Sequence, residues 1–91
     1  MAVEVGAQTL YLVMTVRTPQ FQASVIDAHY ASLDRLRQQG VLELAGPFSD
    51  QSGGAYLIRA DSMAQARDIA YRDPVHTSAS SIVTVYEWHA K

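Results

Sequence analysis

Two residues, His29 and Asp73, have the types and surroundings that could carry acid–base chemistry. A helix that contains His29, at about 100° per residue, gathers apolar side chains on one side. His29 lies among these apolar side chains. The members of this stripe are Phe21, Val25, Ile26, Leu33 and Leu36. A titratable ring on a core-facing stripe needs a polar partner or a cavity. His29 is therefore either a general base or acid, or a buried histidine bonded to a carbonyl or water.

Asp73 is followed by Pro74 at the predicted end of a helix, where a carboxylate opposes the helix dipole. One interpretation is that Asp73 accepts a hydrogen bond from His29, orients the imidazole and balances its charge during proton transfer. The other is that Asp-Pro caps a short turn through His76. Spacing alone leaves both open.

Three further residues are candidates for substrate binding, namely Arg59, Tyr71 and Ser78. Arg59 can instead be an exposed strand residue without a functional role. Ser78 can instead be a loop or strand-edge residue, since no strand–turn–helix elbow surrounds it. The histidines show no i, i+4 spacing, so no metal site and no cofactor are predicted. A metal held jointly by His29 and Asp73 is the one alternative.

Four segments rich in β-branched and aromatic residues are predicted to be strands. They are Thr9–Arg17, Val41–Phe48, Ala55–Ala60 and Ser81–Trp88. The segment Ser49–Gly54 has the composition of a turn, so the middle two strands should form a hairpin with Gly53-Gly54 in its turn.

Two helices should lie between these strands. Thr18 as N-cap and Pro19 as first residue predict a helix that runs to about Gln39 and ends at Gly40. The second should begin after Asp61-Ser62, with Ser62 and Gln65 at capping-box spacing, and end near Arg72 before Asp73-Pro74.

The resulting order, β-α-β-β-α-β, predicts an α+β, ferredoxin-like fold with a four-stranded antiparallel sheet and two helices on one face. The strands are apolar on both sides. In the first strand, one side carries Leu10, Leu12, Met14 and Val16, and the other side carries Tyr11 and Val13. A bare apolar sheet face favours an interface, so we expect a homodimer with the sheets face to face.

Composition narrows the class of protein. The chain has 91 residues, which predicts one domain over residues 1–91, with residues 1–8 as a loose tail. Nine acids, seven scattered bases and a net charge of -2 argue against nucleic-acid binding. No signal peptide or membrane segment is recognised, and zero cysteines exclude disulfides and thiol catalysis, so a cytoplasmic location is expected.

An ordered set of residues resembles the YCII-related (YciI-like) family. The set comprises His29, Leu33, Leu36, Gly40, Leu42, Ala45-Gly46-Pro47, Ala66 and Asp73-Pro74. The resemblance implies a dimeric α/β barrel, a His29–Asp73 active-site dyad facing a pocket, and dehydrochlorination of a chlorinated hydroxyquinol as the associated chemistry. This chain departs from the family in lacking an arginine shortly before His29 and in carrying Ser78-Ala79-Ser80 after Asp-Pro.

The leading hypothesis is a cofactor-independent enzyme of the lyase or isomerase type acting on a small cyclic or phenolic substrate. His29 would move the proton, and Asp73 would orient the imidazole of His29. The alternative is a non-catalytic ligand-binding or regulatory dimer on the same scaffold, since a fold does not dictate function.

Overall fold

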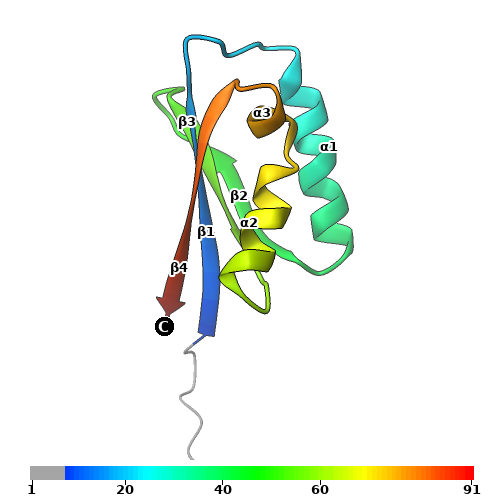
Figure 1. Ribbon diagram of the computed structural model, residues 1–91, viewed down its shortest axis with the longest axis vertical. Helices are drawn as coiled ribbons and strands as arrows, with labels where there is room; N and C mark the ends of the chain where they lie inside the picture. Colours follow the sequence, from blue (N-terminus) through cyan, green and yellow to red (C-terminus); the bar gives the residue numbers. More distant parts are fainter. Residues whose placement is uncertain (1–7) are drawn as a thin grey trace, which may run out of the picture.

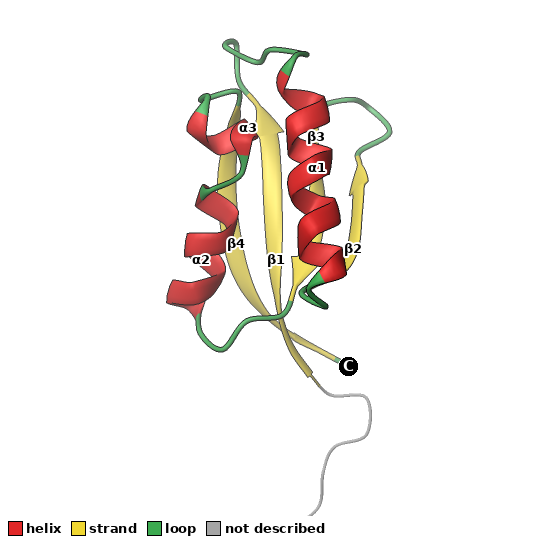
Figure 2. Cartoon of the chain, turned by 90° about the vertical axis from the view of Figure 1, so that its right-hand side faces the viewer, coloured by secondary structure: helices red, strands yellow, loops and turns green. Residues whose placement is uncertain are grey.

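The structure, a computed structural model, describes residues 8–91 as one sheet with helices packed on one side of it (Figures 1 and 2). The strands are β1 (Gln8–Arg17), β2 (Leu42–Pro47), β3 (Gly53–Ile58) and β4 (Ser81–Ala90). The helices are α1 (Val25–Gln38), α2 (Met63–Tyr71) and the short α3 (Pro74–Thr77). The predicted ferredoxin-like fold is confirmed, with α3 as an addition. The expected tail lies outside the described residues except for Gln8, which begins β1.

The sheet is antiparallel throughout, with strand order β2-β3-β1-β4. The predicted hairpin of β2 and β3 is confirmed, with an irregularity in the register between Leu42 and Leu44. Strand alternation sends one set of side chains toward the helices. These form the core with Leu33 of α1 and with Ala66 and Ala70 of α2.

Helix α1 begins at Val25, six residues later than predicted. The segment before it is bound to the loop that precedes β4, which holds it out of the helix. Thr18 donates its hydroxyl hydrogen to the carbonyl of Ala79 at 2.7 Å and accepts from the amide of Gln20 at 3.1 Å. The hydroxyl of Thr18 therefore caps a turn and not a helix, and Phe21 is not part of the helical stripe.

Gly53 and Gly54 are the first residues of β3, so the prediction that they form the hairpin turn was wrong. The turn lies just before them, closed by the amide of Phe48 donating to the Gly53 carbonyl at 2.8 Å. A Cβ on Gly53, at φ +155, would lie 1.8 Å from the carbonyl oxygen of Thr15, so glycine is needed where β1 and β3 approach.

Helix α2 begins as the capping box predicts. The Ser62 hydroxyl accepts from the amide of Gln65 at 3.1 Å, and the Gln65 side chain accepts from the amide of Asp61 at 2.6 Å. The helix ends at Tyr71, and Pro74 starts α3 two residues after Arg72. This abrupt change of direction brings Asp73 to the side of α1.

The sheet face opposite the helices is apolar. Its exposed side chains include Leu44, 67% exposed, and Trp88, 46% exposed. Between them lies a shallow groove of about 240 Å³. Within residues 8–91, no helix has both the length and the apolar character needed to cross a membrane.

Candidate active site

The two residues singled out by the sequence meet across the helices. His29 projects from α1, and its Nδ1 lies 2.7 Å from Oδ2 of Asp73, 44 residues later in the chain. The Asp73 side chain is 3% exposed and that of His29 is 16% exposed. Such a short contact with a buried carboxylate is the strongest polar interaction open to this histidine.

Asp73 serves both interpretations that the sequence left open. Its Oδ1 accepts the amide hydrogen of Val75 at 2.9 Å and caps α3, while Oδ2 binds His29. Since one oxygen is held by the backbone, the carboxylate cannot rotate freely, and it presents a fixed acceptor to the imidazole.

This contact selects one form of the neutral imidazole. An ionised carboxylate only accepts hydrogen bonds, so Nδ1 carries the hydrogen and donates it to Asp73. The lone pair of the neutral ring then lies on Nε2, and only that nitrogen is available to a bound molecule.

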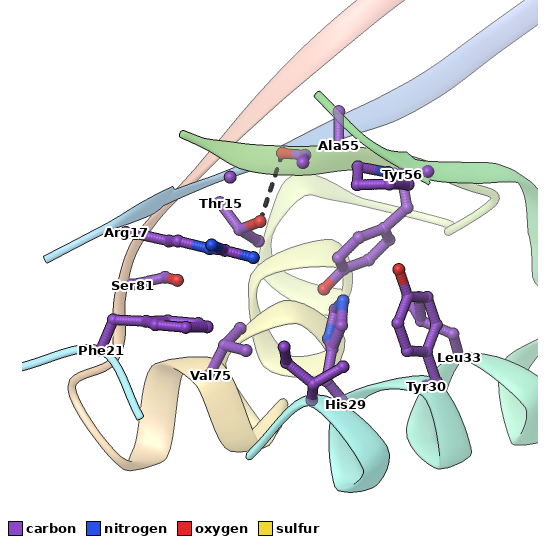
Figure 3. Close-up of a pocket in the computed structure, with 15 residues that line it drawn as sticks. Thr15, Arg17, Phe21, His29, Tyr30, Leu33, Ala55, Tyr56, Val75 and Ser81 are labelled. Carbon is purple, nitrogen blue, oxygen red and sulfur yellow. Dashed lines mark hydrogen bonds between the residues drawn. The ribbon is translucent and has the colours of Figure 1, made fainter. Parts of the chain in front are cut away.

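His29 lines a cavity of about 60 Å³ between the sheet and the start of α1 (Figure 3). The buried side chains in its wall come from β1, β3, α3 and β4 and include Thr15, Tyr56, Val75 and Ser81. Tyr30 and Arg17 lie at its exposed rim. The histidine therefore opens onto a space with a polar and aromatic lining.

Tyr56 places a buried hydroxyl in this cavity. The residue is 2% exposed, and its hydroxyl oxygen has no hydrogen-bond partner within residues 8–91. Burial, reinforced by the negative charge of Asp73, raises the pKa of Tyr56 above its usual value. The phenol therefore stays protonated and can donate a hydrogen bond. Its ring centroid lies 6.2 Å from that of His29.

Arg17 is the second cavity residue that sequence reasoning missed. It is the last residue of β1, and its guanidinium lies 4.1 Å from the ring centroid of Phe21. Strand alternation could have found both residues. Arg17 has the same parity as the helix-facing Tyr11, Val13 and Thr15, and Tyr56 has that of Ile58.

The three residues predicted to bind substrate are not brought to this cavity. Arg59 follows the far end of β3, forms an ion pair with Glu43 and is exposed. Tyr71 stacks on His76 with ring centroids 4.6 Å apart. Ser78 donates its hydroxyl hydrogen to Ser80 at 2.8 Å and belongs to the loop that holds the segment before α1. Ser81, three residues later, lines the cavity instead.

The metal alternative required further ligands near the dyad. In the part of the chain that the structure describes, no group of three or more His, Cys, Asp or Glu side chains is arranged to hold a metal ion.

Comparison with known proteins places the chain in a family. The YCII-related domain matches residues 9–89, which is nearly the whole chain. The protein is a member of the YCII-related family. This confirms the resemblance seen in the sequence. The uncharacterized protein YjpA of Bacillus subtilis (strain 168) is 46% identical over 81 residues, covering 89% of this chain and 95% of YjpA.

Solved structures confirm the fold of this YCII-related protein. A 5-chloro-2-hydroxyhydroquinone dehydrochlorinase, TftG of Burkholderia phenoliruptrix AC1100, in complex with 2,5-dihydroxybenzoquinone, superposes with a TM-score of 0.63 at 20% identity. It covers 87% of this chain and 92% of its own. An antibiotic biosynthesis monooxygenase superposes with a TM-score of 0.61 at 14% identity, covering 92% and 99%.

Proposed function

We propose that this YCII-related protein is an enzyme that moves a proton on a small cyclic or phenolic substrate, with His29 as general base or acid and Asp73 as its orienting partner. The observation that carries the proposal is the 2.7 Å contact between His29 and a buried Asp73 that makes two hydrogen bonds, beside a cavity whose lining includes hydroxyl groups. A histidine that only fills a core has no need of a cavity in front of its free nitrogen.

The geometry suits abstraction of a proton by Nε2. Asp73 holds the tautomer with the lone pair on Nε2, and its negative charge balances the imidazolium that forms. Proton transfer by a positioned side chain contributes about 10²–10⁴-fold to a rate. The protonated ring can then return the proton to another atom of the substrate, as an isomerase requires, or release it to solvent, as a lyase requires.

The structural relative TftG suggests one concrete reaction. Loss of HCl from a chlorinated hydroxyquinol transfers a proton to the base, and chloride leaves with the pair of electrons from the C–Cl bond. This step is neutral in oxidation and reduction overall, so it requires no oxidant or reductant and no cofactor. The one group that this step requires from the protein is a base, which a His–Asp dyad supplies.

We also propose that the protein is a homodimer whose open sheet faces pack together. Apolar side chains such as Leu44, Ile82, Tyr86 and Trp88 are between 46% and 67% exposed on one face. A contiguous apolar surface of this kind is typical of an interface and costly in a monomer.

The test is turnover of a panel of hydroxylated and chlorinated aromatic compounds in D₂O, including 5-chloro-2-hydroxyhydroquinone. NMR would report deuterium incorporation, and a chloride assay would report elimination. His29→Gln should lower the rate by about 10²-fold or more. His76→Gln, which changes an exposed histidine outside the cavity, is the matched control and should leave it unchanged.

Equal rates for the wild type and His29→Gln across the panel would refute the proposal. If the compounds bound without any reaction, the non-catalytic ligand-binding alternative would be favoured instead.

A further inference from the structure

The cavity in front of His29 contains two groups that the dyad does not use, Arg17 and the hydroxyl of Tyr56. Figure 3 shows them pointing into the cavity from different sides, with the imidazole of His29 near the tyrosine hydroxyl. The tyrosine hydroxyl lacks a hydrogen-bond partner within residues 8–91, and the arginine has no carboxylate partner there.

The hydroxyl of Tyr56 is the clearer case. It is buried without a partner in residues 8–91, although buried hydroxyls are hydrogen-bonded in the great majority of proteins. Leaving a donor unsatisfied carries a desolvation penalty. The phenol has a hydrogen to donate, and an oxygen of a ligand would supply an acceptor for it.

Arg17 adds a positive charge to the same cavity. Three other arginines of the described chain, Arg37, Arg59 and Arg72, form ion pairs with carboxylates, whereas Arg35 and Arg67 form none within residues 8–91 and do not line the cavity. Arg17 has no acidic partner among residues 8–91 and instead lies over the ring of Phe21 at the rim. The residues that line the cavity in the described chain include no Asp or Glu, and the nearest carboxylate, that of Asp73, lies behind His29 and is bound to it.

The size of the cavity limits what it can enclose. An enclosed cavity that holds benzene has a volume of about 150 Å³, whereas this one has about 60 Å³. It can therefore take the oxygen-bearing edge of a ring, or a carboxylate, while the rest of a ring lies at the rim beside the aromatic side chains of Phe21 and Tyr30.

We propose that the ligand of this cavity is a small planar molecule with an anionic oxygen, a phenolate or carboxylate, which accepts a hydrogen bond from Tyr56 and faces the charge of Arg17. The inference rests on the proposed function for the role of His29, and it adds the substrate class. Tyr56 and Arg17 then determine specificity by favouring anions over neutral molecules of the same shape.

The experiment measures binding, not turnover, by calorimetry with three probes. Benzoate carries a carboxylate, 4-nitrophenolate carries a phenolate, and benzamide is the neutral counterpart of benzoate. For the wild type, at least one anion should bind about tenfold or more tightly than benzamide. Whichever anion binds identifies the source of the oxygen.

Two variants test the two residues. Tyr56→Phe should weaken binding of the anion by about tenfold or more, as expected for a hydrogen bond to a charged group. The same change should raise the Tm of the free protein by about 4 °C or more, because it removes a buried unsatisfied hydroxyl. Arg17→Gln should reduce the preference for anion over benzamide to about threefold or less. Arg59→Gln, the same change of charge outside the cavity, should not affect it.

Benzamide binding as tightly as both anions would overturn the proposal, as would equal losses for Arg17→Gln and Arg59→Gln or unchanged anion binding by Tyr56→Phe. Absence of binding by both anions would also overturn it. The proposed function would still be decided separately, because the rate ratio between the wild type and His29→Gln does not depend on these probes.

Discussion

Asp73 has two separable tasks, so two substitutions at this position should differ in their effect on stability. Asp73→Ala removes the cap on α3 and the partner of His29 together. Loss of an N-cap costs about 1 kcal/mol, and loss of a hydrogen bond between charged groups costs about 1.5–3 kcal/mol. The sum is about 2.5–4 kcal/mol. At about 4–8 °C per kcal/mol for a domain of this size, the Tm should fall by about 10–30 °C.

Asp73→Asn keeps the shape and most of the stability. Asparagine is as good an N-cap as aspartate, so its carbonyl oxygen can still accept from the amide of Val75. Its NH₂ group then faces Nδ1 of His29 and donates to it. The free energy of unfolding should fall by only about 1 kcal/mol, because a neutral hydrogen bond replaces a charge-assisted one.

The activity of Asp73→Asn should fall strongly, although its stability is nearly unchanged. In Asp73→Asn the imidazole must accept at Nδ1 and carry its hydrogen on Nε2, which removes the lone pair that faces the cavity. A base in the wrong tautomer is inactive, and the same change in a serine-protease triad lowers kcat by about 10⁴-fold. We expect a loss of about 10²–10⁴-fold in turnover, with the fold intact by circular dichroism.

The assays are thermal denaturation, turnover on the substrate identified by the panel, and ¹⁵N NMR of the imidazole to report which nitrogen carries the hydrogen. Turnover by Asp73→Asn at the wild-type rate, with the hydrogen of His29 on Nε2, would refute the argument about the tautomer. A Tm of Asp73→Ala within a few degrees of the wild type would refute the stability estimate.

Three further predictions concern other parts of the molecule. Because the pKa of Tyr56 is raised in the folded state, the unfolded chain loses this proton first as the pH rises through about 10 and the folded state loses stability, so urea midpoints of Tyr56→Phe should fall less than those of the wild type between pH 9 and pH 11. Gly53→Ala should cost about 3 kcal/mol or more, or prevent folding, because its Cβ would meet the carbonyl oxygen of Thr15; denaturation compared with Gly40→Asn, where no atom lies within 4 Å of a Cβ, checks this. Leu44→Glu should shift the protein from dimer to monomer in analytical ultracentrifugation without unfolding it, since Leu44 is 67% exposed; a wild-type monomer at micromolar concentration would contradict the proposed interface.

The positions at which sequence reasoning failed share a physical cause. Thr18-Pro19 is a good local signal for the start of a helix, but its hydroxyl is used by the loop before β4, a contact 61 residues away. Gly53-Gly54 has the composition of a turn, but Gly53 is needed because β1 approaches it closely. Local propensity cannot register such contacts, because the competing partner is distant in the chain.

Candidate site residues divide in the same way. Arg59 and Tyr71 have side chains suited to substrate binding, yet Arg59 pairs with Glu43 and Tyr71 stacks on His76. Arg17 and Tyr56 line the cavity because of the parity of their strands and because β1 and β3 are neighbours in the sheet. That neighbour relation belongs to the topology and not to either strand alone.

The amino-acid sequence by itself determined the order of the elements, the split of each strand into two faces, the place of His29 on the inward side of a helix and the break in the chain at Asp73-Pro74. These properties follow from periodicity and from the restricted backbone of proline, which act within a few residues. Only the tertiary structure decided that Oδ2 of Asp73 reaches His29 while Oδ1 caps α3, and that Arg17 and Tyr56 share their cavity. Those arrangements depend on how α1, α3 and the sheet pack, since distances between side chains 44 residues apart are set by the whole fold.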